Sequence, residues 1–252
     1  MEKETKRKLT LKSFFLDYVL LFATAILISV FAIITKQKFI KILPCYITLF
    51  VHLFDSKVNR IGKLIGASNC IIYSIGYFQD GLFGNAMSAL LYSMPIQVIT
   101  FAMWSKNKYK MGVIVRSYSR PHRFNVFLLG AIATFISIWV FNVILNSNYG
   151  TIQGILFASG LVYSLLMMFG YIEGIFIAVP SSILSLGLYI YITIHDNHAS
   201  ITYVIIGAYT LIKMTIALIN WIRLYKEQSL LNDGVFLMDY DKPSEALKNL
   251  KK

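Results

Sequence analysis

The chain has 252 residues, of which 57% are hydrophobic and 14% are charged, with a mean hydropathy of +0.64 and a formal net charge of +12. Because soluble domains carry about 25% charged residues, this composition excludes a soluble globular protein, whose helices would need polar faces that these segments lack. Nucleic-acid binding is also excluded as the reason for the positive charge, since basic residues beside membrane helices set orientation and attract anionic lipid.

Eight apolar segments follow one another along the chain. A helix that crosses the hydrocarbon core needs about 20 mostly apolar residues. The second and third segments are shorter and carry Lys41, His52 and Lys63 near their ends, where long Lys side chains reach the interface. We therefore predict an all-α membrane protein with eight transmembrane helices, at residues 14–35, 39–54, 61–78, 82–104, 124–145, 151–169, 171–194 and 201–222.

Basic residues alternate along these helices. Five Lys and Arg precede the first helix, three lie at the junction of the second and third, six lie between the fourth and fifth, and six follow the eighth. The connections at 79–81, 146–150 and 195–200 contain no Lys or Arg. The positive-inside rule therefore places both termini in the cytoplasm. Lys36, Lys38 and Lys41 fall on the outer side of this topology, and the other loops outweigh them.

An internal repeat relates the two halves of the chain. A shift of 117 residues places Tyr92 on Tyr209 and Trp104 on Trp221, and a slightly different shift places 68–69 on 181–182. Two like-oriented three-helix bundles, joined by a linker helix and preceded by one extra helix, are expected, with a substrate site near the midplane between them. The corresponding segments are 1–13 (cytoplasmic N-terminus), 14–35 (extra helix), 39–104 (first bundle), 105–123 (a solvated basic loop), 124–146 (linker helix), 151–224 (second bundle) and 225–252 (cytoplasmic tail).

Polar residues inside membrane helices are costly and commonly face a cavity or a partner. The set here is Asn69, Asn85, Gln97, Ser181, Ser182, Ser185 and Lys213. Gln97 and Asn69 either hold a polar ligand or form hydrogen bonds between helices. Lys213 extends to the inner surface, pairs with Glu173 or faces the pathway, and Asp17 is expected near the inner interface.

Catalytic and metal-binding patterns are missing from the sequence. The four His are scattered, and Cys45 and Cys70 lie within predicted helices, as small apolar packing residues do. No zinc-site spacing and no phosphate-binding Gly-rich loop is present. We expect a protein that is not an enzyme and that uses no cofactor and no metal.

Several short runs and one pair of residues carry a resemblance to a known family. The runs 68–73 (SNCIIY) and 81–104 (GLFGNAMSALLYSMPIQVITFAMW), Gln153 twenty residues before Glu173, and the run 182–189 (SILSLGLY) resemble the PnuC family of bacterial vitamin-precursor transporters. The resemblance covers roughly 39–223. Where the family has a Trp-x-x-Trp motif, this chain has Ile175, Phe176, Ile177 and Ala178, and two acidic positions are Gln153 and Ser182.

The resemblance implies a SWEET-like three-plus-one-plus-three fold in a bacterial cytoplasmic membrane. It implies facilitated diffusion of nicotinamide riboside or a related unphosphorylated vitamin precursor, retained by phosphorylation in the cytoplasm. Carriage of thiamine, riboflavin or a deoxynucleoside is an alternative, and a non-transporting scaffold or accessory subunit is a rival from another class.

The partners expected are a small molecule with a heteroaromatic ring and the lipid bilayer, with a homo-oligomer left open. Aromatic rings for stacking and polar groups for hydrogen bonding make up the expected site. The predicted substrate-binding residues are Asn69, Tyr92, Gln97, Phe101, Trp104, Ser182, Tyr189, Tyr209 and Trp221.

Overall fold

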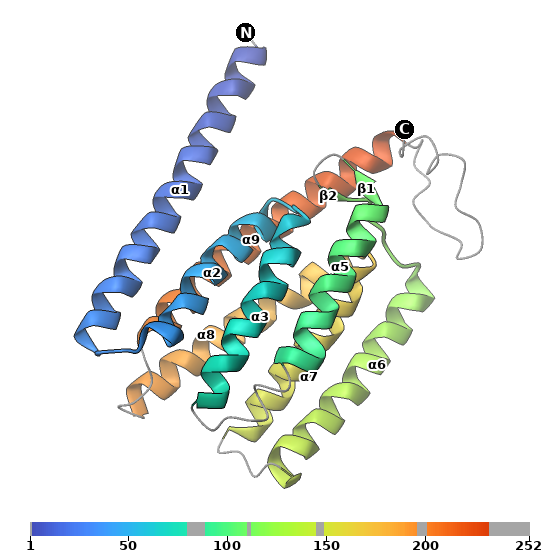
Figure 1. Cartoon of the computed structure of the whole chain (residues 1–252). Coiled ribbons are helices and arrows are strands. Elements are labelled where there is room, and N and C mark those ends of the chain that lie inside the picture. The colour runs from blue at the N-terminus through green and yellow to red at the C-terminus, as the bar shows by residue number, and fades with distance from the viewer. Residues whose placement is uncertain (1, 80–88, 110–111, 145–148, 196–200, 232–252) are drawn as a thin grey trace.

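The computed structural model describes residues 2–79, 89–109, 112–144, 149–195 and 201–231. These residues are helical apart from short connections and one small antiparallel hairpin (Figure 1). The elements in chain order are α1 (Glu2–Ile34), α2 (Phe39–Ser56), α3 (Ile61–Gln79), the π-helical η1 (Ala89–Ser93), α5 (Met94–Lys106), β1 (Lys108–Tyr109), β2 (Gly112–Val113), α6 (Arg120–Trp139), the π-helical η2 (Val140–Ile144), α7 (Gly150–Met168), α8 (Glu173–His195) and α9 (Ile201–Leu231).

Each of the eight predicted segments contains a helix. Five stretches among the described residues are long and apolar enough to cross a membrane, and a shorter apolar helix covers Ile42–Ser56. The five are Asp17–Ile34, Pro121–Ile144, Gly150–Met168, Glu173–His195 and Ile201–Ser229. Crossing of the membrane by all eight helices therefore stays a prediction.

Several helices extend beyond their predicted bounds at polar ends. α1 begins at Glu2, ahead of the predicted residue 14, and α9 continues to Leu231, beyond the predicted residue 222. Hydropathy reports only the part of a helix that can lie in hydrocarbon, so helical extensions of polar sequence escape it. Residues 82–88 of the predicted fourth helix, including Asn85, lie outside the described residues.

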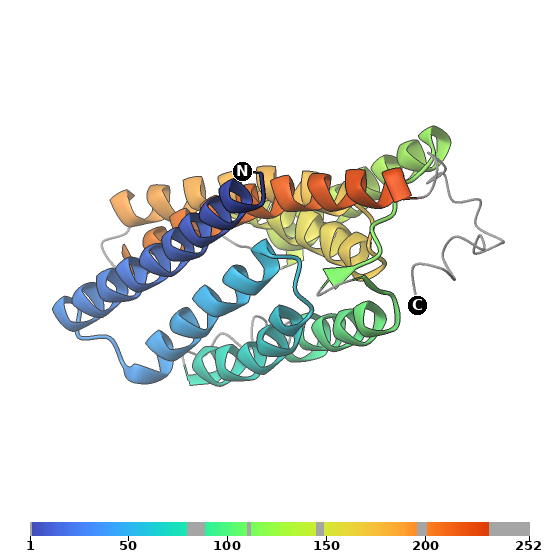
Figure 2. The same cartoon turned by 90° about the horizontal axis from the view of Figure 1, so that it is seen from above.

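We refer to α2, α3 and α5 as one helix group and to α7, α8 and α9 as the other. α3 packs against α2 and α5, and α8 packs against α7 and α9. Seen from above, α3 and α5 lie on one side of the molecule, with α8 and α9 on the other (Figure 2). The groups meet where α2 contacts α9 and where α5 contacts α7. Each of these two contacts joins helices from the two halves of the chain.

The two remaining helices lie on the outside of this arrangement. α6 packs along α7, and α1 lies against both α2 and α9. The first half of α1 projects beyond the other helices (Figure 1). α1 thus covers one of the two seams at which the groups meet.

A buried ion pair attaches α1 to the core. Lys213 of α9, whose side chain is 0% exposed, donates from Nζ to Asp17 Oδ1 of α1 at 2.6 Å, and Asp17 Oδ2 lies 3.4 Å from Nζ of Lys57. The partner of Lys213 is therefore Asp17 and not Glu173. α1 packs against α9, which brings the two charges together across 196 positions of sequence.

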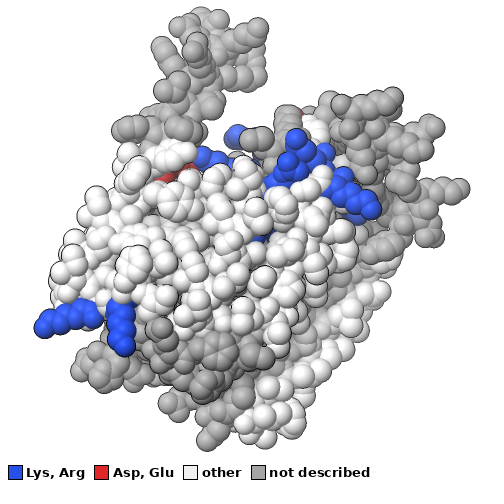
Figure 3. All heavy atoms as spheres, in the orientation of Figure 1, with Lys and Arg blue, Asp and Glu red and all other residues white. Residues whose placement is uncertain are grey.

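Lys and Arg gather at one end of the bundle, which we call the basic end, defined by the described residues of 57–60, 106–109, 112–123 and 223–226. Figure 3 shows positive side chains gathered there, and a smaller positive group at the other end. Lys36 and Lys38, in the connection from α1 to α2, are exposed. The positions of Lys and Arg therefore agree with the alternation of basic and neutral loops in the sequence. The connection from α1 to α2 is the exception, as it was in the sequence.

The segment between α5 and α6 is packed and not solvated, contrary to expectation. Val113, Ile114 and Val115 are at most 2% exposed. The Gln228 side chain of α9 accepts from the Val115 amide at 2.8 Å and donates to the Val113 carbonyl at 3.2 Å. Its basic residues predicted that this segment lies in water, but Val113, Ile114 and Val115 are buried at the basic end. We call these three residues the lid.

Candidate functional site

Two adjoining chambers lie between the two groups of helices. The larger has a volume of about 420 Å³ and the smaller about 90 Å³. Four residues line both chambers, namely His52 of α2, Tyr163 of α7, Ala178 of α8 and Met214 of α9. Ligand pockets commonly have volumes of about 300–1,000 Å³, so the combined space suits a small molecule.

The larger chamber is lined by aromatic rings and hydroxyl groups. Three tyrosines, Tyr73, Tyr163 and Tyr189, contribute rings. The hydroxyl groups come from Thr48, Ser181, Ser182, Ser185 and Thr210. Rings that stack and short side chains that donate and accept hydrogen bonds are the groups that hold a polar molecule with a flat ring.

The smaller chamber lies toward the basic end. Gln97 and Thr100 of α5 line it, together with Asp55 of α2 and Lys63 of α3. Lys63 donates from Nζ to Asp55 Oδ2 at 2.9 Å, and both residues are buried. The opposite charges of Asp55 and Lys63 offset each other, so this chamber is polar but has no net charge from this pair.

Three of the predicted site residues line the chambers. Gln97 lies in the smaller chamber, and Ser182 and Tyr189 lie in the larger one. Asn69, which is 5% exposed, lies just outside the lining and donates to Thr48 Oγ1 at 2.9 Å and to the Pro44 carbonyl at 3.2 Å. Asn69 therefore positions a hydroxyl of the larger chamber.

The two predicted tryptophans, Trp104 and Trp221, contact each other and do not line either chamber. The rings of Trp104 and Trp221 are T-shaped with centroids 5.8 Å apart, and both residues are 0% exposed. Trp104 Nε1 donates to the Met167 carbonyl at 2.8 Å. They belong to the apolar cluster under the lid, together with Val113 and Val115, so their contribution to binding stays a prediction.

The other three predicted residues also lie outside the lining. Tyr92 packs against Phe157 of α7 with ring centroids 5.9 Å apart. Tyr209 donates from its hydroxyl to the Leu49 carbonyl of α2 at 3.0 Å. The Phe101 ring lies 6.0 Å from the guanidinium of Arg60. Each of these contacts packs the helices around the chambers.

Comparison with known proteins assigns the family. Residues 38–223 match the family model described as nicotinamide mononucleotide transporter, the PnuC family. The chain belongs to this family. Among curated protein sequences, none matches it significantly. A crystal structure described as that of the vitamin B3 transporter PnuC has the same fold, with a TM-score of 0.70 and 20% identity, covering 84% of this chain and 92% of that chain.

Membership of the PnuC family makes the chain a multi-pass membrane transporter, which binds a small molecule and lies in a lipid bilayer. The matched range begins at residue 38, after α1. The matched range spans α2 to most of α9, and α1 precedes it.

Sequence reasoning missed most of the polar lining, including the two buried charges. Asp55 and Lys63 line the smaller chamber, and His52 and Tyr163 line both. Asp55 follows the predicted end of the second helix, where a charge is ordinary. Sequence periodicity does not predict the pairing of Asp55 with Lys63, which lie eight positions apart across the turn between α2 and α3. Their opposite charges at the ends of two short apolar helices were the signal that could have indicated this ion pair.

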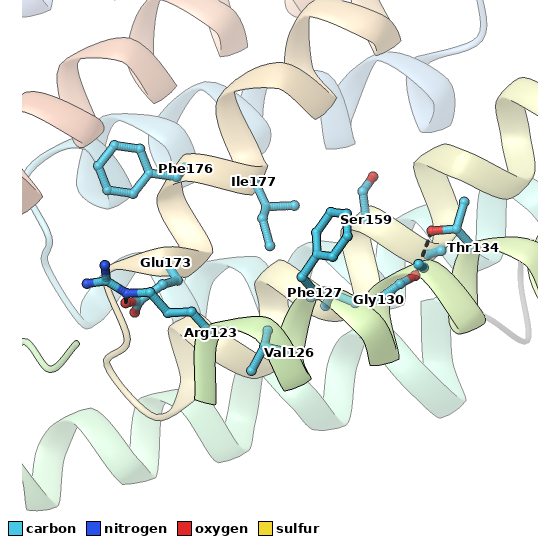
Figure 4. Close-up of a pocket in the computed structure, with 12 residues that line it drawn as sticks. Arg123, Val126, Phe127, Gly130, Thr134, Ser159, Glu173, Phe176 and Ile177 are labelled. Atoms are coloured by element: carbon cyan, nitrogen blue, oxygen red, sulfur yellow. Dashed lines mark hydrogen bonds and ion pairs between the residues drawn. The ribbon is translucent and has the colours of Figure 1, made fainter. Parts of the chain in front are cut away.

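A separate groove opens on the outer side of this PnuC-family fold. It lies between α6, α7 and α8, has a volume of about 360 Å³ and is lined mostly by apolar side chains such as Phe127 and Ile177 (Figure 4). Arg123 Nε and Glu173 Oε1, 2.9 Å apart, lie at its basic end. Because α6 carries mostly exposed apolar residues, as lipid-facing helices do, we place the candidate substrate site in the central chambers.

Proposed function

We propose that the protein carries nicotinamide riboside, or a related unphosphorylated vitamin precursor, by facilitated diffusion through the two central chambers. The observation that carries this proposal is a cavity between the two helix groups with tyrosine rings at one end and buried polar groups at the other. Transporters built from repeats bind substrate between the repeats near the midplane. The ring stacks in the larger chamber, and the polar part reaches Gln97.

The charges of the lining favour an unphosphorylated substrate. Among the described residues that line the chambers, Lys63 is the only Lys or Arg, and Asp55 already holds its ammonium. A phosphate buried without a free cation would carry an uncompensated charge in a low-dielectric space. We therefore favour the riboside over the mononucleotide that gives the family its name.

Contacts between equivalent positions support a three-plus-one-plus-three arrangement of parallel repeats. Trp104 and Trp221, which the repeat superimposes, touch each other, as residues beside a two-fold axis do. Tyr92 packs on α7, and its counterpart Tyr209 packs on α2. In this arrangement, which is SWEET-like, α6 is the linker and α1 is the extra eighth helix.

The tryptophan pair and the lid form a closure on one side of the cavity. Trp104, Trp221 and Val115 are all 0% exposed and stand between the smaller chamber and the basic end. With the basic end in the cytoplasm of a bacterial cell, as the positive-inside rule places it, this conformation is closed to the cytoplasm. Release of substrate then requires the tryptophan pair to part.

A different ring-containing precursor is the second candidate substrate. Ile175 and Ala178 stand where the resemblance gives tryptophans, and both line the smaller chamber, with Ala178 lining both. An alanine in place of an indole leaves more room and removes a stacking face. This favours riboflavin, thiamine or a deoxynucleoside as the alternative cargo.

Transport by purified protein tests the proposal against a scaffold or accessory role. Proteoliposomes without any imposed gradient are given labelled nicotinamide riboside, thiamine, riboflavin and thymidine in separate reactions. A carrier equilibrates one of these compounds and shows counterflow when the vesicles are preloaded with the same compound unlabelled. A scaffold gives the rate of empty liposomes for all four, and dependence on a proton or sodium gradient would contradict facilitated diffusion.

A further inference from the structure

The smaller chamber contains buried hydrogen-bonding atoms that have no protein partner. Among the described residues these are His52 Nδ1, Asp55 Oδ1 and Gln97 Oε1. All three residues line this one chamber of about 90 Å³. Buried polar groups in native proteins are nearly always hydrogen-bonded, and exceptions call for a functional explanation.

Gln97 is held in place by a glycine on the neighbouring helix. The amide of Gln97 lies flat against Gly66 of α3, where a β-carbon would be 3.1–3.3 Å from the amide carbon, oxygen and nitrogen. An alanine there would force the amide to move by a few tenths of an ångström. The absence of a side chain at Gly66 therefore positions the Gln97 amide at the chamber.

Asp55 supplies a second acceptor, and His52 supplies a nitrogen that accepts or donates according to the tautomer of its ring. Asp55, which is 8% exposed, gives Oδ2 to Lys63 and keeps Oδ1 without a partner. Neutral imidazole has one nitrogen that accepts and one that donates, and Nδ1 of His52 has no partner. Carboxylate and amide oxygens only accept, so a complementary ligand group must donate.

We propose that the smaller chamber is a subsite for a hydroxyl group of the substrate, while the ring occupies the larger chamber. This inference rests on the proposed function and specifies what the carried molecule must contain. The chamber holds little more than one small group, because its volume is about 90 Å³ against about 420 Å³ for its neighbour. A donor satisfies the buried acceptors, whereas an ether or a methyl group leaves them desolvated and unpaired.

Matched substrate pairs test the subsite. The wild-type protein in proteoliposomes is first assayed with nicotinamide riboside, thiamine, riboflavin and thymidine. Each carried compound is then compared with its O-methyl ether, in which the hydroxyl hydrogens are replaced and the ring is unchanged. We expect uptake of the ether to fall by about 100-fold or more, because a site built to hydrogen-bond a hydroxyl strongly rejects the analogue that lacks it.

Two variants locate the effect in the chamber. Gly66→Ala displaces the Gln97 amide without replacing a lining residue, and His52→Phe removes the ring nitrogens of His52 from the chamber. Each should reduce the discrimination between hydroxyl and ether to less than about 10-fold. His195→Phe, at an exposed position near the opposite end, is the matched control and should discriminate like the wild type. Size-exclusion elution and the thermal transition show which variants are folded.

The outcomes separate this inference from the proposed function. Uptake of a parent compound and its ether at equal rates by wild-type protein overturns the subsite and leaves the transport proposal intact. Failure to carry any of the four parent compounds refutes the proposed function, and the subsite with it. The comparison of a parent compound with its ether in the wild-type protein tests the subsite even if a chamber variant does not fold.

Discussion

Replacing Asp17 with Asn removes the charged partner of a lysine that lies entirely inside the helical core. Lys213 is 0% exposed and Asp17 is 17% exposed at the side chain, with 2.6 Å between Nζ and Oδ1. Removal of one partner from a buried pair costs about 3–5 kcal/mol, because the other charge remains buried without compensation. Asn keeps an oxygen that accepts from Lys213, so we expect a loss of about 3 kcal/mol, at the low end of that range.

The thermal transition in detergent measures this loss. For a chain of this size about 2–4 °C corresponds to 1 kcal/mol, so the Asp17→Asn transition should fall by about 6–12 °C. Lys57→Met is the matched control, because Lys57 lies 3.4 Å from the same carboxylate but is 35% exposed. An exposed pair contributes about 1 kcal/mol or less, and the control should shift correspondingly little.

A double variant separates charge compensation from packing. Asp17→Asn combined with Lys213→Met keeps a long side chain in α9 and leaves no buried charge, so the thermal transition should recover most of the loss. The reasoning is refuted if Asp17→Asn melts within about 2 °C of the wild type, or if the double variant is no more stable than the single one.

Three further predictions concern the basic end. Gly170 has φ of +81°, and a β-carbon there would lie 2.7 Å from the Ile114 carbonyl oxygen, so Gly170→Ala should lose about 1–3 kcal/mol in an unfolding titration; an unchanged midpoint would contradict the strain. Trp104→Phe leaves a buried carbonyl without its donor and should cost about 1–3 kcal/mol more than Trp221→Phe, whose indole nitrogen has no partner; equal losses would count against that hydrogen bond. Gln228→Leu should speed amide hydrogen exchange in 113–115, and unaltered exchange would show that packing alone holds the lid.

Hydropathy and charge predicted where the helices lie, because both depend on local sequence. The run 201–222 is apolar enough to be recognised as a helix, and α9 begins at Ile201 as expected. Its polar extension to Leu231 escaped prediction, and Gln228 of this extension contacts the 113–115 segment more than 100 positions away, a contact that local sequence does not reveal. The same reason explains the lid, whose burial is a property of the partner helix and not of its own charge.

The site was predicted less well than the helices, for a geometric reason. Gln97 lines a chamber and Trp104 lies in the apolar cluster, although positions seven apart on α5 occupy nearly the same side of the helix. Sequence shows that a residue is polar or aromatic inside a membrane helix, but not whether the space beside it at that depth is filled once the neighbouring helices pack. Asp55 escaped prediction because it stands at a helix end, where its pairing with Lys63 depends on the turn that joins α2 and α3.

The most direct test of the account is uptake of labelled vitamin precursors by proteoliposomes that contain either the wild type or Gln97→Leu. If the central chambers are the pathway, the wild-type protein equilibrates one of the labelled compounds, and the folded Gln97→Leu variant stays at the rate of empty vesicles. Equal uptake by the two proteins would contradict the account, because substrate would then cross without using the chamber that Gln97 lines.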